Sequence, residues 1–248
     1  MNLLNTGIKI CVASLALGAS TVNAALILSE TFSYADGNLV GNSTWAVHSG
    51  TANPIQVASG VITLLQGAGP REDVNIKPIG LLPLAVGGRV YASFDVAVSG
   101  SSSNVYFAHF IQGTTFFDAR IFVAPFVNSD YTIGLGTGAN PTSTWATGFT
   151  FGNTYKIVVS YDFDTGTTNL WVNPASEISP MISVGGTAFR AIEGFGFRQA
   201  NPTIANTQII DNLMLGTTFA SAIPEPSSYA AIFGGLALAA VMARRRRA

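Results

Sequence analysis

Short runs in which apolar and polar residues alternate dominate the middle of this 248-residue chain. In residues 89–98 every even position is apolar, from Val90 to Val98, and the odd positions include Ser93 and Asp95. Successive side chains of a strand point to opposite faces, so this pattern predicts a strand with one buried face. Similar runs occupy residues 25–32, 61–66, 105–111, 120–127, 145–151, 155–161, 169–172, 189–198 and 208–215.

Clusters of turn-forming residues separate these runs. Ala-Asp-Gly-Asn at 35–38, Gly-Ser-Ser-Ser at 100–103 and Asp-Thr-Gly at 164–166 are typical, because Gly, Asn, Asp and Ser stabilise tight turns. No convincing helical period crosses them. Ten or more short strands of this kind favour a sandwich or a barrel, and we expect an all-β fold, an antiparallel β-sandwich of two sheets.

Composition limits the chemistry of the chain. Only 10% of the residues are charged, and residues 25–222 carry seven basic and twelve acidic side chains, a net charge of −5. Nucleic-acid binding needs a basic surface, so we expect no nucleic-acid partner. One cysteine, Cys11, and two histidines predict neither a disulfide framework nor a Cys- or His-based metal centre.

The first 24 residues have the layout of a secretory signal peptide. Lys9 precedes an apolar stretch at residues 10–19, and the small residue Ala24 ends the segment before Ala25. The apolar stretch is about half as long as a membrane-spanning helix. We therefore expect export by the general secretion machinery, with cleavage between Ala24 and Ala25.

The other end of the chain contains a second apolar segment. Residues 229–243 form an uncharged stretch of fifteen residues, about 22 Å long as a helix. A cluster of arginines follows it, and basic clusters are retained on the cytoplasmic side of a membrane. We expect a short transmembrane helix at 229–243. The motif ahead of it is Pro224, Glu225 and Pro226, and the basic cluster is Arg244, Arg245, Arg246 and Arg247.

A Pro-Glu-Pro motif, an apolar helix and a terminal arginine cluster, in this order, resemble the PEP-CTERM protein-sorting signal of Gram-negative bacteria. The resemblance implies recognition by exosortase, a membrane-embedded cysteine transpeptidase that cuts near the motif. Pro-Glu-Pro would then be a processing address, and the arginines a temporary stop-transfer element. We accordingly expect a signal peptide at 1–24, a β-sandwich domain at 25–222 and a sorting signal at 223–248. The chain would be anchored transiently in the inner membrane and then reach the cell surface or extracellular matrix.

A second resemblance concerns the domain between the two ends. The hairpin at 161–174, the last strand at 209–216 and the opening at 30–37 are similar to segments of concanavalin A-like, laminin G-like jelly-roll domains. That resemblance implies a fold shared by lectins, polysaccharide hydrolases and adhesive modules. A shared fold does not choose among these activities.

The sequence contains no recognisable catalytic motif, and we predict no catalytic residues. A β-glucanase of this fold would be expected to show Glu-x-Asp-x-x-Glu, which is absent. Asp162 and Asp164 share a strand face but precede a Thr-Gly turn, which indicates a solvated hairpin end. His48 and His109 have no recognisable catalytic partners, and His109 is expected at a strand surface or satisfied and half-buried.

Sugar binding would use exposed aromatic faces. Trp45, Trp145 and Tyr131 are the candidate glycan contacts, and Tyr106 and Trp171 are further aromatic candidates. Core packing remains the commoner role of any one tryptophan.

Calcium is a weaker candidate ligand. Asp36, Asp130 and Asp211 supply hard oxygen ligands, but no loop has the spacing of a calcium site, and turn hydrogen bonds explain such residues equally well. We therefore expect no cofactor, with Ca²⁺ as the alternative. The predicted function is a non-enzymatic exported surface or matrix protein, with extracellular polysaccharide as a candidate partner. The alternative is a secreted polysaccharide hydrolase.

Overall fold

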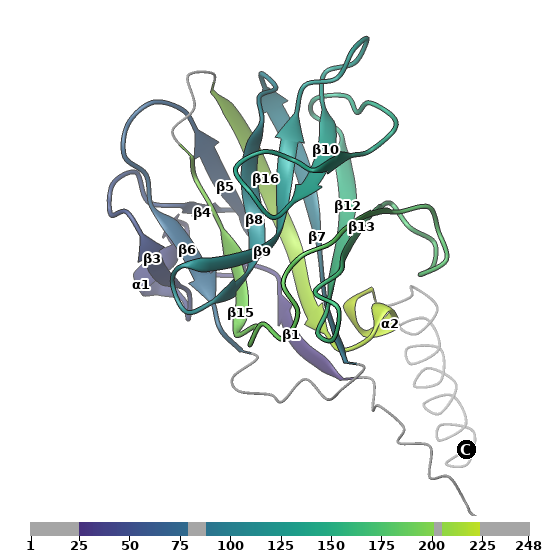
Figure 1. The fold of residues 1–248 in the computed structure, drawn as a ribbon. Helices are drawn as coiled ribbons and strands as arrows, with labels where there is room; N and C mark the ends of the chain where they lie inside the picture. Colours follow the sequence, from purple (N-terminus) through teal and green to yellow (C-terminus); the bar gives the residue numbers. More distant parts are fainter. Residues whose placement is uncertain (1–24, 79–87, 201–204, 224–248) are drawn as a thin grey trace, which may run out of the picture.

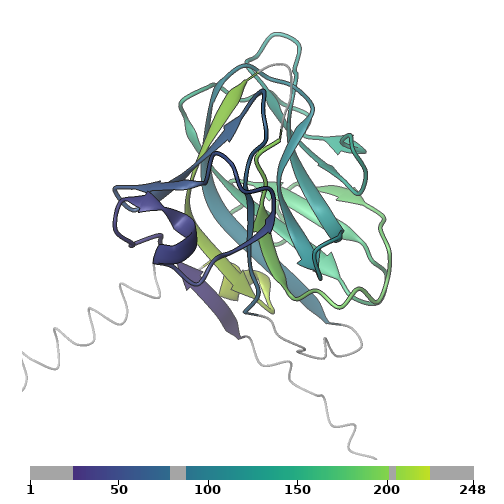
Figure 2. The same ribbon diagram turned by 90° about the vertical axis from the view of Figure 1, so that its left-hand side faces the viewer.

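The computed structural model describes residues 25–78, 88–200 and 205–223. The signal peptide, the motif at 224–226, the helix at 229–243 and the arginine cluster all fall outside these ranges. The described part is an all-β sandwich of two antiparallel sheets (Figure 1). The same sandwich is seen from the side in Figure 2. The predicted fold class is confirmed.

One sheet has nine strands among the described residues, and β7 and β16 form its centre. Strand β1 (Leu26–Glu30) pairs with the second half of β16. The other strands lie in the order β14 (Ile182–Val184), β13 (Thr168–Val172), β12 (Thr154–Asp162), β7 (Arg89–Gly100), β16 (Asn206–Gly216), β5 (Val61–Gln66), β4 (Gln56–Ala58) and β2 (Gly37–Asn38).

The other sheet has seven strands within the described ranges, and its outer face carries the candidate site. Its order is β11 (Ser143–Thr144), β10 (Thr132–Gly136), β9 (Phe116–Ala124), β8 (Val105–Gln112), β15 (Gly194–Phe197), β6 (Asp73–Ile76) and β3 (Ala46–Ser49).

The core fills the space between the sheets. The apolar even positions of β7, from Val90 to Val98, are all buried in it, as their alternation predicts. Phe94 of β7 packs across the layer against Phe107, Phe195 and Phe197, with ring centroids 5.8–6.1 Å apart. Such aromatic clusters bury a large apolar area and dominate the stability of a core.

Strand β15 shows how the sequence opens space on the outer face. Its Gly-Phe-Gly-Phe sequence directs Phe195 and Phe197 into the core and alternates them with glycines. A Cβ on Gly196 would lie 2.8 Å from Cε1 of His109 on the neighbouring strand. The missing side chain therefore leaves room for the His109 ring.

A short C-terminal helix covers part of the nine-stranded sheet. Helix α2 (Phe219–Ala222) is capped by Thr218, whose Oγ1 accepts a hydrogen bond from the Ser221 N–H at 3.1 Å. Phe219 packs edge-on against Tyr91 and Trp171. The outer face of β7 is therefore buried at Tyr91, because the Phe219 ring covers it. The sequence predicts a strand with only one buried face, and this part of β7 differs from that prediction.

The other helical element, α1 (Leu39–Asn42), spans four residues beside β2 and β3. Within the described ranges, no helix has the length and apolar character needed to cross a membrane.

The run at 145–151 was predicted as a strand and is largely a loop. It contributes a single bridge, between Tyr131 and Phe149. A Cβ on Gly148 would lie 2.2 Å from the Ser129 Cβ, so the chain passes too close to its neighbour for the side-chain alternation of a strand.

Candidate functional site

A row of rings crosses the outer face of the seven-stranded sheet. His48 on β3 meets His109 on β8 with ring centroids 5.6 Å apart, and His109 meets Phe117 on β9 at 4.4 Å. Tyr106 on β8 packs edge-on against His109 at 5.9 Å and against Phe122 at 5.7 Å. These neighbours hold the Tyr106 ring in one position.

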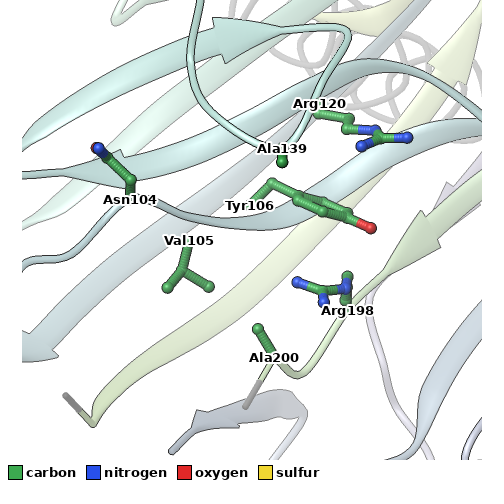
Figure 3. Close-up of a pocket in the computed structure, with 7 residues that line it drawn as sticks. All are labelled: Asn104, Val105, Tyr106, Arg120, Ala139, Arg198 and Ala200. Atoms are coloured by element: carbon green, nitrogen blue, oxygen red, sulfur yellow. The ribbon is translucent and has the colours of Figure 1, made fainter. Parts of the chain in front are cut away.

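Two guanidinium groups flank that ring. The Cζ of Arg198 lies 4.2 Å from the ring centroid of Tyr106, and the Cζ of Arg120 lies 4.9 Å from it. Arg120 Nη1 also donates a 2.9 Å hydrogen bond to the Gly138 carbonyl. Figure 3 shows the phenol between the two guanidinium groups, and Asn104 at the other end of the cleft. This Tyr106 cleft has a volume of about 470 Å³ and is lined by Asn104, Val105, Tyr106, Arg120, Ala139, Arg198 and Ala200.

The positive charge of the cleft is only weakly compensated. Among the described residues Arg120 makes no ion pair, and the Nε of Arg198 lies 3.9 Å from the Asp73 Oδ2. By contrast, Lys77 Nζ is 2.9 Å from the Glu193 carboxylate. The cleft is therefore a cationic site on a domain whose net charge is negative.

His109 is buried beneath this cleft, so the prediction of an exposed or satisfied half-buried histidine is wrong. Its Nδ1 lies 3.2 Å from the Phe110 carbonyl oxygen, and its Nε2 has no hydrogen-bond partner within the described ranges. Burial, followed by the charges of His48, Arg120 and Arg198, lowers the pKa of His109 to about 3. Burial likewise lowers the pKa of His48 to about 4. Both rings are neutral at pH 7. His109 packs directly against the Tyr106 ring, and His48 packs behind His109.

The neutral state of His109 predicts a loss of stability in mild acid. An unfolded histidine binds a proton at about pH 6.5, whereas folded His109 does so near pH 3. The unfolded state holds more protons between these values, so the free energy of unfolding decreases as pH falls through that window. Between pH 7 and pH 5 the titration of His109 lowers the free energy of unfolding by about 2 kcal/mol. Urea denaturation at pH 7 and pH 5 measures this decrease. In the His109→Phe variant the free energy of unfolding should decrease by about 2 kcal/mol less than in the unmodified chain.

Asp73 acts in the opposite direction. Burial raises its pKa from 3.8 to about 6, so the folded state holds more protons than the unfolded state between these values. Its contribution to stability grows as pH falls, equally in both chains, and cancels in the comparison. An identical pH dependence of the two chains would contradict the assigned role of His109.

Two of the three predicted glycan contacts lie in the core. Trp45 is 3% exposed, donates from Nε1 to the Glu30 carboxylate at 3.2 Å and stacks on Phe197. Tyr131 is 0% exposed and stacks on Phe151. Neither ring offers a face to a sugar, which corrects that prediction.

The remaining aromatic candidates divide between core and surface. Trp145 is half-buried against the core and remains a candidate contact. Trp171 is buried beneath α2. Tyr106 alone among the five aromatic candidates lines the described cleft. The sequence analysis missed Arg120 and Arg198. Arg120 lies within the largely apolar strand β9 and Arg198 directly follows β15, and an arginine in such a position is the only signal that the sequence offers.

The three predicted calcium ligands accept hydrogen bonds from backbone N–H groups. Asp36 Oδ1 accepts from the Ser59 N–H, Asp130 Oδ2 from the Phe151 N–H, and Asp211 Oδ1 from the Asn212 N–H, at 2.6–2.8 Å. In the part of the chain that the structure describes, no three His, Cys, Asp or Glu side chains are grouped for a metal ion.

The C-terminal segment matches the family model described as the PEP-CTERM protein-sorting motif, over residues 222–247. This chain carries a PEP-CTERM sorting motif. Its first two matched residues, Ala222 and Ile223, belong to the described structure. Ala222 ends α2, and its carbonyl accepts a hydrogen bond from the Ser93 hydroxyl of β7. These first two residues of the motif are thus packed against the nine-stranded sheet.

Solved structures share the sandwich of this PEP-CTERM chain. A sialidase has a TM-score of 0.53 at 14% identity, over 78% of this chain and 19% of the sialidase. The exoplasmic/lumenal domain of VIP36, in a form bound to Ca²⁺ and mannose, has a TM-score of 0.51 at 12% identity, over 77% of this chain and 90% of the VIP36 domain. The carbohydrate recognition domain of Emp47p has a TM-score of 0.50 at 10% identity, over 81% of this chain and 99% of the Emp47p domain.

These similarities establish a lectin-like, concanavalin A-like sandwich, and the chain spans about a fifth of the sialidase it matches. No curated protein matches the sequence.

Proposed function

We propose that this chain is an exported, exosortase-processed protein whose β-sandwich binds carbohydrate at the cell surface or in the extracellular matrix. The observation that carries the proposal is the PEP-CTERM motif at residues 222–247. Export by the secretion machinery removes residues 1–24 between Ala24 and Ala25. The segment at 223–248 then anchors the chain briefly in the inner membrane until exosortase cuts it, so that the 25–222 domain acts outside.

Carbohydrate binding is supported by the fold together with the Tyr106 cleft. Ligand sites of about 300–1,000 Å³ with a few convergent polar groups are typical of small-molecule and sugar recognition. The cleft has about 470 Å³, a rigidly packed phenol and two guanidinium groups. Ca²⁺ is not required by this proposal, because the cleft provides its own charged groups.

The carboxylates of Asp162 and Glu193 do not fit the general acid of a glycoside hydrolase, which supports a non-enzymatic role. The Arg89 side chain pairs with Asp162 at 2.9 Å, and Lys77 pairs with Glu193 at 2.9 Å. The pKa of each carboxyl lies below its usual range. A general acid in glycoside hydrolysis needs a raised pKa instead.

A glycan array probed with the processed protein, recovered from the cell surface or medium, tests the proposal. We expect retention on polysaccharides, the host's own exopolysaccharide included, without release of reducing ends. Release of reducing ends that vanishes in Asp162→Asn or Glu193→Gln would replace binding by hydrolysis as the function.

A further inference from the structure

The Tyr106 cleft combines features that select among carbohydrates, and this inference rests on the proposed carbohydrate-binding function. Arg120 and Arg198 approach the same phenol ring from strand β9 and from the end of β15. Their like charges repel. Among the described residues two carboxylates act on them: Asp73, at 3.9 Å from the Arg198 Nε, and buried Asp118, which interacts electrostatically with Arg120 but pairs with Arg190 at 3.7 Å. An anion between the two groups would relieve this repulsion.

The fixed orientation of the two arginines suits a planar anion. Arg120 is held by the Gly138 carbonyl, and the Arg198 guanidinium lies over the Tyr106 ring with its Nε 3.9 Å from the Asp73 carboxylate. The ring between them is itself packed against His109 and Phe122. Guanidinium groups bind carboxylates through two parallel hydrogen bonds, and little side-chain entropy is lost when they are already ordered.

The rest of the cleft suits the neutral part of a sugar. The Tyr106 hydroxyl and the Asn104 amide offer donors and acceptors for ring hydroxyls, and Figure 3 shows Asn104 away from the guanidinium groups. Val105, Ala139 and Ala200 supply small apolar surfaces.

We propose that the Tyr106 cleft binds an acidic saccharide, with the carboxylate of a hexuronate between Arg120 and Arg198 and the sugar ring extending toward Asn104. The positive field of these arginines also contributes to the lowered pKa of buried His109. The domain would therefore attach to uronate-containing polysaccharide and not to neutral polymers.

Isothermal titration calorimetry of the processed protein tests this specificity. The probes are tetrasaccharides of galacturonate, of alginate uronates and of glucuronate-containing hyaluronan, with methyl-esterified tetragalacturonate as the neutral match. We expect at least one acidic probe to bind and its methyl ester, where tested, to lose the affinity. Arg120→Gln and Arg198→Gln should each weaken binding about 10- to 100-fold, because a hydrogen bond between charged groups is removed.

Arg89→Gln is the matched control. It removes the same charge from the other sheet, where Arg89 pairs with Asp162 and Glu177, and should leave the affinity unchanged. Equal losses of affinity in Arg89→Gln and Arg120→Gln would show that the effect comes from the net charge of the protein and not from the cleft, and would overturn the proposal. Saturation by inorganic sulfate alone, or tighter binding of single-stranded DNA than of any saccharide, would also overturn it.

Two failures are distinguishable. Binding of neutral oligosaccharides without any acidic one overturns the acidic-saccharide proposal and leaves carbohydrate binding in place. Absence of binding to both classes, by protein whose circular dichroism shows a folded β-sandwich, overturns both proposals.

Discussion

Replacement of Pro224, Glu225 and Pro226 by three alanines is expected to keep the exported chain, with its C-terminal segment still attached, in the membrane fraction. The two prolines remove backbone donors and hold the preceding residues extended, whereas alanines would allow the helix predicted at 229–243 to continue toward the domain. A helical segment would not present its backbone to a processing enzyme. We expect release to fall to the level seen in cells that lack exosortase, measured by immunoblotting of membrane and released fractions.

The arginine cluster provides a matched control for that variant. Changing residues 244–247 to four lysines keeps the positive charges and the long stems that reach the membrane interface. Processing of this variant should continue. Release of the triple-alanine variant at the unmodified level would show that the Pro-Glu-Pro motif is not the processing address.

Phe94→Ala is expected to cost about 3–5 kcal/mol of the free energy of unfolding. Phe94 is fully buried at the centre of the sandwich, where it contacts Phe107 of the opposite sheet and both phenylalanines of β15. Its removal leaves a cavity that the rigid sheets cannot close. For a domain of this size Tm should fall by about 6–20 °C.

Phe189→Ala is the corresponding surface change. Phe189 is 66% exposed and packs edge-on against Phe163, so its truncation should cost about 1 kcal/mol or less. Urea denaturation followed by tryptophan fluorescence compares the two variants. Similar losses for Phe94→Ala and Phe189→Ala would contradict the assignment of the core.

Local alternation was sufficient to predict the central strands. The run at 61–66 has the same bounds as β5, and the run at 89–98 lies within β7. Strand β6 was not predicted because its polar residues Asp73 and Asn75 are buried together with its apolar ones, so the sequence shows no alternation. Their polar groups are satisfied by distant partners, the Gln199 N–H and the Ala46 carbonyl, which no local pattern reveals.

The candidate site was predictable only in part. Tyr106 was recognised as an aromatic candidate, but Arg120 and Arg198 come from separate strands far apart in the sequence. The pairing of β8 with both β9 and β15 brings them to one ring, and this pairing is a property of the topology. Trp45 and Tyr131 were misplaced because each lies just outside a strand, where alternation does not say which way a side chain points.

The most direct test of this account is the intact mass of the exported protein in cells with and without active exosortase. We predict that active cells yield a chain that begins at Ala25 and lacks residues 229–248, and that exosortase-deficient cells yield a chain that retains them. Retention of residues 229–248 in cells with active exosortase would contradict the account.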